Sequence, residues 1–157
     1  LDGMSEATLE KFIACGFIKD FDDLFHLDCY EEQIKEMIDL AIRQLDYSYA
    51  PYSHFHVGAA LLAKNGTYYT GCNIENASFG ATICAERCAI FKAVSDGCTK
   101  IDKIVIVCST HDFAYPCGIC RQVMTEFMDE NGIIVVTNDK EIREYKLSDL
   151  MPESFRM

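Results

Sequence analysis

Two stretches organise this chain: residues 82–93, which read TICAERCAIFKA, and residues 115–122, which read YPCGICRQ. The first stretch holds Cys84, followed two positions later by the carboxylate of Glu86. The second opens a Cys-x-x-Cys pair directly behind a proline. Together they offer three thiols and one acid. The rest of the chain is interpreted as the support that brings these two stretches together.

Three cysteines at this spacing predict a catalytic zinc site. Zinc prefers four tetrahedral ligands, and a catalytic zinc keeps one position open for water. Cys84, Cys117 and Cys120 supply three ligands. Pro116 in the first turn of a helix would place Cys117 and Cys120 one turn apart on the same face. Cys84 is expected at the start of a second helix capped by Thr82, so that both helix ends point at the metal.

The charge of such a site needs compensation. Positive helix ends favour thiolates, but three thiolates on a divalent ion leave a net negative centre. We therefore expect Arg87 and Arg121 to donate hydrogen bonds to the sulfurs. A water on the metal is expected to have a pKa lowered from about 16 toward about 7. Glu86 is not needed as a ligand and is predicted to carry the proton of that water to a substrate.

The order Cys-Ala-Glu and then Pro-Cys-x-x-Cys is the signature of zinc deaminases. Four motifs agree in order and spacing and resemble the small homotetrameric cytidine deaminases, across roughly residues 30–155. They are YSHFHVGAA at 52–60, GCNIENA at 71–77, ICAER at 83–87 and PCGICRQ at 116–122. The resemblance implies a cytoplasmic homotetramer with one zinc per subunit. It also implies hydrolysis of cytidine and 2′-deoxycytidine to uridine and 2′-deoxyuridine with release of ammonia, in pyrimidine salvage.

The same resemblance assigns the substrate contacts. Asn73 and Glu75 would hold the ribose hydroxyls, Phe55 would form a wall of the pyrimidine pocket, and Phe155 would stack on the base across a subunit interface. Without the resemblance, Asn73 and Glu75 fit turn residues equally well. Phe55 then fits a core aromatic, and Phe155 fits a tail residue that docks on the surface. The remaining implied contacts, partly to a neighbouring subunit, are Ala77, Phe79 and Ala85.

Two alternatives to this function stay open. A related deaminase for a modified cytosine nucleoside, such as an aminoacyl-nucleoside antibiotic, would share the metal and the acid. A structural zinc protein would need a fourth ligand, and Cys88, one turn beyond Cys84, is the candidate. His56 stands where the family commonly has proline. We interpret His56 as a local change in a loop. We assign no histidine as a zinc ligand, because three thiolates suffice.

Composition narrows the possible partners. The chain has 157 residues, a net charge of −11 and nine cysteines. An acidic chain without a basic cluster does not favour nucleic acid, whereas an uncharged nucleoside meets no electrostatic barrier. No window approaches the ~20 apolar residues of a membrane span, and no leader is visible, so reduced cytosolic cysteines are expected.

The pattern of apolar residues predicts an α/β fold with three layers, α/β/α, around a central mixed sheet of about five strands. We expect an N-terminal extension at 1–28, in which 1–3 are a cloning remnant, and a single catalytic domain at 29–157. Asp28 is expected to open a helix through a capping box with Glu31. The expected elements are helix 30–45, strands 57–63 and 67–73, helix 83–95, strand 103–108, helix 117–130 and strands 133–137 and 145–148.

Overall fold

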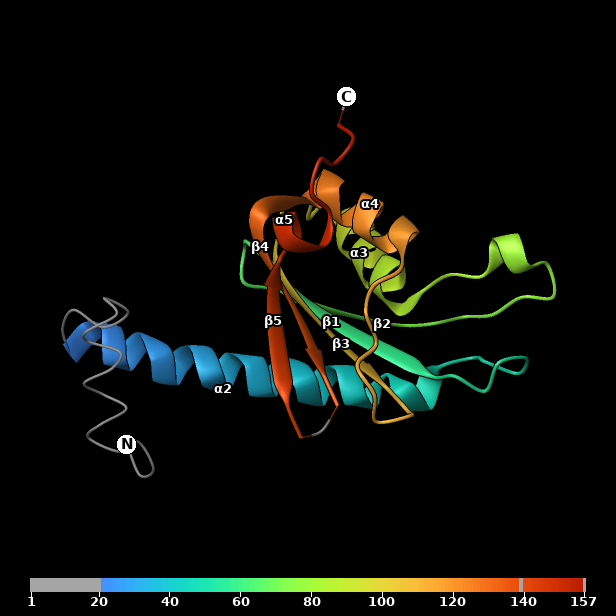
Figure 1. Ribbon diagram of the computed structural model, residues 1–157, viewed down its shortest axis with the longest axis horizontal. Coiled ribbons are helices and arrows are strands. Elements are labelled where there is room, and N and C mark those ends of the chain that lie inside the picture. The colour runs from blue at the N-terminus through green and yellow to red at the C-terminus, as the bar shows by residue number, and fades with distance from the viewer. Residues whose placement is uncertain (1–20, 139, 157) are drawn as a thin grey trace. The chain divides into compact units, whose positions relative to one another are not determined.

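A five-stranded mixed sheet forms the centre of the fold, with strand order β2-β1-β3-β4-β5 (Figure 1). The computed structural model describes residues 21–138 and 140–156. β3 and β4 are parallel, and every other neighbouring pair is antiparallel. The predicted mixed sheet is therefore confirmed. The strands are β1 (Val57–Ala63), β2 (Tyr68–Cys72), β3 (Ile101–Cys108), β4 (Met128–Thr137) and β5 (Ile142–Lys146).

The hairpin of β1 and β2 turns at Lys64-Asn65-Gly66, between the two predicted strands. Gly66 adopts a φ of 85°, which glycine reaches without the steric cost of a side chain. Its amide donates to the carbonyl of Ala63 at 2.9 Å, which closes the turn. β2, the second strand of this hairpin, is one edge of the sheet. The chain leaves it toward the helix that begins at Ala85.

Three helices cover one face of the sheet, namely α3 (Ala85–Ser95), α4 (Gly118–Phe127) and α5 (Leu147–Leu150) (Figure 1). Their inward side chains join alternate residues of β3 in one buried cluster. Gly71 on β2 permits the close approach of α3, because a Cβ there would lie 2.6 Å from the carbonyl oxygen of Ala85. The start of α3 is thereby held directly on the sheet.

The opposite face is buried as well. Val105 and Val107 alternate with the β3 residues of that cluster and are also inaccessible to solvent. A Cβ at Gly58 would lie 2.0 Å from the carbonyl oxygen of Ala41, in the last turns of α2 (Phe21–Arg43). Adjacent positions on a strand point to opposite faces. Since Gly58 pairs with Cys72, and Gly71 with Ala59, residues 37–43 of α2 lie on a different face from α3, which confirms the three-layer α/β prediction.

The described residues from Met37 onward form one compact unit, and residues 21–36 belong to another. α2 runs across this division and is continuous through Asp28, so the predicted capping box at 28–31 is wrong. Residues 1–20 of the predicted N-terminal extension lie outside the described residues. Two short 3-10 helices complete the fold, η1 (Leu45–Tyr47) and η2 (Phe79–Ala81). Within the described ranges, no helix has both the length and the apolar character that crossing a bilayer requires.

Two predicted boundaries near the C-terminus are also wrong. α4 ends at Phe127 rather than at 130, and β4 begins at once with Met128, which is buried and pairs with Ile101 of β3. β5 occupies Ile142–Lys146 rather than 145–148, because its pairing with β4 starts at Thr137. In both places, contacts with a neighbouring strand decide the boundary, and local turn signals do not.

Candidate metal centre and active site

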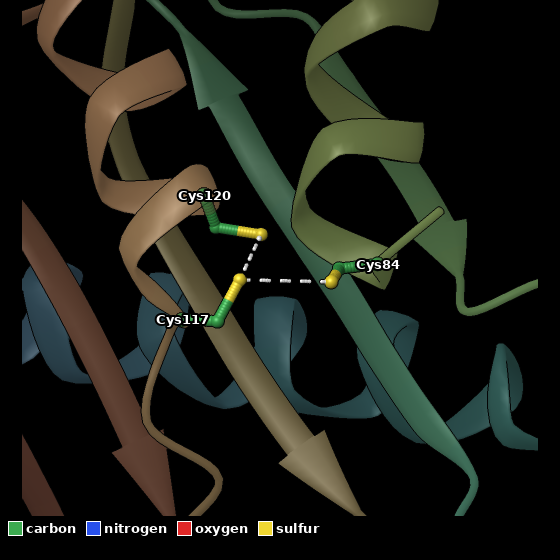
Figure 2. A group of neighbouring side chains, drawn as sticks. All are labelled: Cys84, Cys117 and Cys120. Atoms are coloured by element: carbon green, nitrogen blue, oxygen red, sulfur yellow. Dashed lines mark hydrogen bonds between the residues drawn. The ribbon is translucent and has the colours of Figure 1, made fainter. Parts of the chain in front are cut away.

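Three sulfur atoms converge at the face of the sheet that carries α3 and α4 (Figure 2). The Sγ atoms of Cys84 and Cys117 are 3.8 Å apart, and those of Cys117 and Cys120 are 3.6 Å apart. All three ligand atoms lie within 4.8 Å of one another. A tetrahedral zinc with Zn–S bonds of about 2.3 Å separates its sulfurs by about 3.8 Å. The donor set and its spacing therefore fit zinc.

The sulfurs are positioned by the starts of two helices. Cys84 is the N-cap residue of α3, and Cys117 is the N-cap residue of α4. The predicted cap at Thr82 is therefore wrong, since α3 begins only at Ala85. Neither cysteine makes a side-chain capping hydrogen bond, so both sulfurs are left for another partner. Cys120 follows one turn into α4 and is fully buried behind them.

The cluster contains no fourth thiol among residues 21–138 and 140–156. Cys88, the candidate for a closed structural site, points elsewhere, because its Cβ would lie 2.9 Å from a Cβ placed on Gly71 of β2. No histidine of the described chain belongs to the cluster. His56 instead bonds through its backbone N–H to Ser109 Oγ at 3.2 Å. Three protein ligands leave one tetrahedral position, as a catalytic zinc requires.

Hydrogen bonds favour the thiolate form of Cys84. A hydrogen bond from the Cys120 thiol, followed by one from Arg87, lowers the pKa of the Cys84 thiol to about 5. The Arg87 guanidinium lies 3.5 Å from Cys84 Sγ and also donates to the carbonyl of Thr82 at 3.2 Å. Arg121 does not repeat this arrangement. It donates to the carbonyl oxygens of Pro116 and Leu150, so its role in the structure is to link α4 to the end of α5.

Glu86 lies in the first turn of α3, two residues after Cys84. Only 4% of its surface is exposed. Burial raises the pKa of its carboxyl to about 7, and the nearby Cys84 acts in the same direction. A carboxyl with a pKa near neutrality is able both to accept and to donate a proton at neutral pH.

The metal centre opens into a cavity of about 370 Å³. Seven of the predicted site residues line it: Phe55, Asn73, Glu75, Cys84, Ala85, Glu86 and Cys117. Sequence reasoning missed seven others, namely Val57, Thr82, Ile83, Ile106, Phe113, Ala114 and Tyr115. The last three belong to the irregular segment between β3 and α4. Its position directly before the Pro-Cys motif was the one available signal that it would face the metal.

Asn73 lies at the cavity and is held by three hydrogen bonds. Its Oδ1 accepts from the hydroxyl of Ser48 and from the amide of Val57, and its Nδ2 donates to the carbonyl of Phe55 at 2.8 Å. The residue is almost fully buried. Its amide therefore fixes the loop that carries Phe55 to the cavity wall, a structural role that the sequence did not predict.

Glu75 is held by the same loop. One carboxylate oxygen accepts from the amides of Tyr52 and Ser53, at 2.9 and 3.2 Å, and the other accepts from the Ser53 hydroxyl. These donors lower the pKa of the Glu75 carboxyl, the Ser53 hydroxyl most strongly. Glu75 is thus an oriented carboxylate at the cavity.

Three residues expected at the substrate lie outside this cavity, namely Ala77, Phe79 and Phe155. The segment that carries η2 projects from the sheet, and Phe79 is 79% exposed there (Figure 1). Its ring packs edge-on against Tyr52 at 6.4 Å. Phe155 is 68% exposed, and its carbonyl accepts from Gln122 at 3.1 Å. Their contact with a neighbouring subunit stays a prediction.

Known proteins share both the sequence pattern and the fold. Residues 31–137 match the family described as the cytidine and deoxycytidylate deaminase zinc-binding region. The cytidine deaminase of Sporosarcina psychrophila is 44% identical over 123 residues, 78% of this chain and 90% of the relative. The probable cytidine deaminase of Dictyostelium discoideum is 42% identical over 126 residues, 80% of this chain and 85% of the relative.

Solved structures of cytidine deaminases have a similar fold. The cytidine deaminase of Burkholderia pseudomallei is 40% identical, with a TM-score of 0.73 over 77% of this chain and 98% of that one. The enzyme of Mycobacterium tuberculosis is 35% identical, with a TM-score of 0.70 over 78% and 97% of the two chains. The match to a zinc-binding region, with the three-sulfur cluster, confirms the predicted zinc cofactor. This chain belongs to the cytidine and deoxycytidylate deaminase family.

Proposed function

We propose that this chain catalyses the hydrolytic deamination of cytidine and 2′-deoxycytidine to uridine and 2′-deoxyuridine. Water adds at C4 of the base, the C4–N bond breaks, and ammonia leaves. The observation that carries the proposal is that Glu86, Cys84 and Cys117 line one cavity, where Cys120 completes the three-sulfur cluster. Relatives named cytidine deaminase at 42 to 44% identity support it.

Cys84, Cys117 and Cys120 are the zinc ligands in this proposal. When bound, zinc supplies Lewis-acid chemistry that makes water reactive at neutral pH. Arg87 offsets part of the thiolate charge through its hydrogen bond to Cys84. The positive ends of α3 and α4 act in the same direction, because both helices start at a ligand.

Glu86 moves the protons of the reaction. Its carboxylate accepts a proton from the attacking water and delivers it to N3 of the pyrimidine ring. It then takes the proton of the new C4 hydroxyl and passes it to the amine, which leaves as ammonia while the C4 carbonyl forms. A pKa of about 7 suits both directions of transfer, since the acid and the base form are then both populated at neutral pH. Burial of Glu86 also keeps bulk water from competing for these protons.

The cavity favours an uncharged nucleoside over a nucleotide. Its lining includes the carboxylates of Glu75 and Glu86 and no lysine, arginine or histidine among the described residues. A phosphate would meet two acids and no cation. Glu75 accepts from a ribose hydroxyl, and the amide of Asn73 keeps one N–H for the sugar. Phe55 and Ala85 contact the base.

The wider setting follows the family resemblance. Residues 29–157 form the catalytic domain, and residues 1–28 are an extension. The enzyme is a cytoplasmic homotetramer for pyrimidine salvage, with one zinc per subunit and no nucleic-acid or membrane partner. Exposed Phe79 and Phe155, with the backbone at Ala77, are the parts that reach a neighbouring subunit. Burial of two aromatic rings at an interface would remove apolar surface from water.

The direct test measures the loss of cytosine absorbance and the release of ammonia with cytidine as substrate. CMP and dCMP serve as matched comparison substrates that differ only by the phosphate or by the phosphate and the sugar. We expect turnover of cytidine and at least about a 100-fold lower kcat/KM for both nucleotides, as expected for an uncompensated charge in the site. Preference for a nucleotide, or no turnover of either nucleoside by zinc-loaded protein, would overturn the proposal.

A further inference from the structure

The wall of the cavity formed by residues 113–115 belongs to no helix or strand. It lies between the end of β3 and Cys117, and Phe113 and Tyr115 both line the cavity. Irregular segments have no ladder of backbone hydrogen bonds to hold them, so side-chain contacts must set their position. The contacts of this segment therefore bear directly on the shape of the substrate site.

Arg143 of β5 makes two of these contacts. The central carbon of its guanidinium lies 3.8 Å from the centroid of the Phe113 ring, a cation–π geometry. One of its terminal nitrogens donates to the hydroxyl of Tyr115 at 3.1 Å. The same guanidinium is oriented by Glu141, which accepts from Nε at 2.8 Å and from the other terminal nitrogen at 3.3 Å. One planar group thus holds both aromatic residues of the wall.

Tyr145 adds a third contact from the same strand. Its hydroxyl lies 3.1 Å from that of Tyr115, and the two rings meet edge-on with centroids 5.8 Å apart. Arg143 and Tyr145 are two residues apart, so their side chains leave the same face of β5. They pair with Val136 and Ile134, which both belong to the core cluster beneath α3 and α4. The anchor is therefore part of the rigid sheet.

We propose that Arg143 is a positioning residue for substrate binding, which acts by holding Phe113 and Tyr115 in the cavity wall. This inference rests on the proposed nucleoside deamination. Arg143 contacts neither Glu86 nor a sulfur in the described hydrogen bonds, so its loss should act on KM far more than on kcat. Lysine should not replace it, because an ammonium group offers no planar fork to stack on Phe113 while it bonds Tyr115 and Glu141.

The test compares KM, kcat and zinc content of the holoenzyme carrying Arg143→Ala, Arg143→Lys or Arg43→Ala. Arg43 is an exposed arginine in the last turn of α2 and controls for the loss of a positive charge. We expect KM for cytidine to rise about three- to fivefold in both Arg143 variants, the size of one cation–π contact at an exposed site. kcat should change less than about twofold, zinc should stay bound, and Arg43→Ala should match the wild type.

A double-mutant cycle tests whether Arg143 acts through Tyr115. Tyr115→Phe removes the hydroxyl that Arg143 and Tyr145 contact, so Arg143→Ala should raise KM less in that background than in the wild type. Should Arg143→Ala fail to fold, Glu141→Gln weakens the orientation of the guanidinium and should raise KM by a smaller factor. Full additivity of the cycle, or unchanged KM in the folded Arg143 variants or in Glu141→Gln, would overturn the inference.

The two proposals fail in different ways. If the wild-type protein does not deaminate cytidine, the proposed function is wrong. If the wild type does deaminate cytidine and the Arg143 variants bind it equally well, only the role of Arg143 is wrong. A rise in KM shared equally by Arg43→Ala would also contradict that role, because it would reflect the charge of the protein rather than the cavity wall.

Discussion

The Sγ atoms of Cys84 and Cys117 lie 3.8 Å apart, although 33 positions separate the two residues in the sequence. Each is the N-cap residue of its own helix, so the sheet that carries α3 and α4 is what brings the sulfurs together. The metal centre is therefore a property of the fold. Changes to either a ligand or the helix seating should disturb the same site.

Replacement of a ligand should release zinc, whereas replacement of a nearby cysteine should not. Cys120→Ser removes a buried sulfur of the cluster, and we expect zinc affinity to fall at least about 100-fold. Cys88→Ser, on the same helix as Glu86 but outside the cluster, is the matched control. Metal analysis of both purified variants checks this. Loss of zinc from Cys88→Ser together with retention in Cys120→Ser would contradict the assigned ligands.

The seating of α3 depends on Gly71. A Cβ at this position would lie 2.5 Å from the amide nitrogen of Ala89 and 2.6 Å from the carbonyl oxygen of Ala85, and backbone atoms cannot turn aside. We expect Gly71→Ala to lower the free energy of unfolding by about 3 kcal/mol, the upper end for overpacking. Because α3 starts beside Cys84, zinc affinity should fall too.

Gly80 provides the control for that substitution. A Cβ there would meet nothing within 4 Å, so Gly80→Ala should change the free energy of unfolding by less than about 0.5 kcal/mol. Chemical denaturation of both variants gives the comparison. Equal stability of Gly71→Ala and the wild type would show that α3 does not sit as closely on β2 as described.

Asn73 should affect both stability and substrate binding. Asn73→Ala leaves the amide of Val57 and the carbonyl of Phe55 without their side-chain partner, and we expect a loss of about 1–3 kcal/mol in unfolding free energy. KM for cytidine should rise as well, because the loop with Phe55 is released. Ser48→Ala removes one donor to Asn73 and should have a smaller effect. Wild-type stability of Asn73→Ala would contradict the bracing role.

The lowered pKa of the Glu75 carboxyl predicts that the stability of the fold depends on pH. This carboxyl has a pKa below the ordinary 4.5, chiefly because the Ser53 hydroxyl donates to it. A carboxyl whose pKa is lowered by folding stabilises the fold above its unfolded pKa, and this contribution is lost as the pH falls through the folded pKa. Ser53→Ala should therefore be less stable than the wild type at pH 7, and the difference should shrink as the pH falls below 4.5.

Denaturation of the two proteins across that pH range measures the difference directly. Part of it should persist at low pH, because the Ser53 hydroxyl also accepts from the amide of Phe55 at 3.0 Å. Ser48→Ala, which does not contact Glu75, should give a difference that is independent of pH in this range. A constant difference for Ser53→Ala would mean that its hydroxyl does not lower the pKa of Glu75.

Much of the site could be predicted because the residues that carry its chemistry lie in short sequence motifs. Cys84, Glu86, Cys117 and Cys120 lie in two compact stretches, and zinc restricts the number and type of its ligands. The strands could be predicted as well. The unbroken apolar run within β3 indicates a strand that is covered on both faces. The turn at Gly66 followed from local backbone chemistry.

What could not be predicted depends on contacts between distant segments. The brace of Arg143 on Phe113 and Tyr115 joins an edge strand to an irregular loop, and neither segment shows a period or a motif. Met128 begins a strand because it pairs with Ile101 of β3. The helix therefore ends before Asn131-Gly132, the residues at which the sequence predicts its end. Tertiary packing decides such features, so local sequence patterns carry no signal of them.

The central claim is that Glu86 transfers protons beside a zinc ion held by three thiolates. The most direct test is to measure zinc content and cytidine turnover together in Glu86→Gln, which keeps the size of the side chain and removes its acid function. We predict the zinc content of the wild type and a kcat reduced at least about 100-fold. Wild-type turnover by this variant, or an active wild-type enzyme that contains no zinc, would contradict the account.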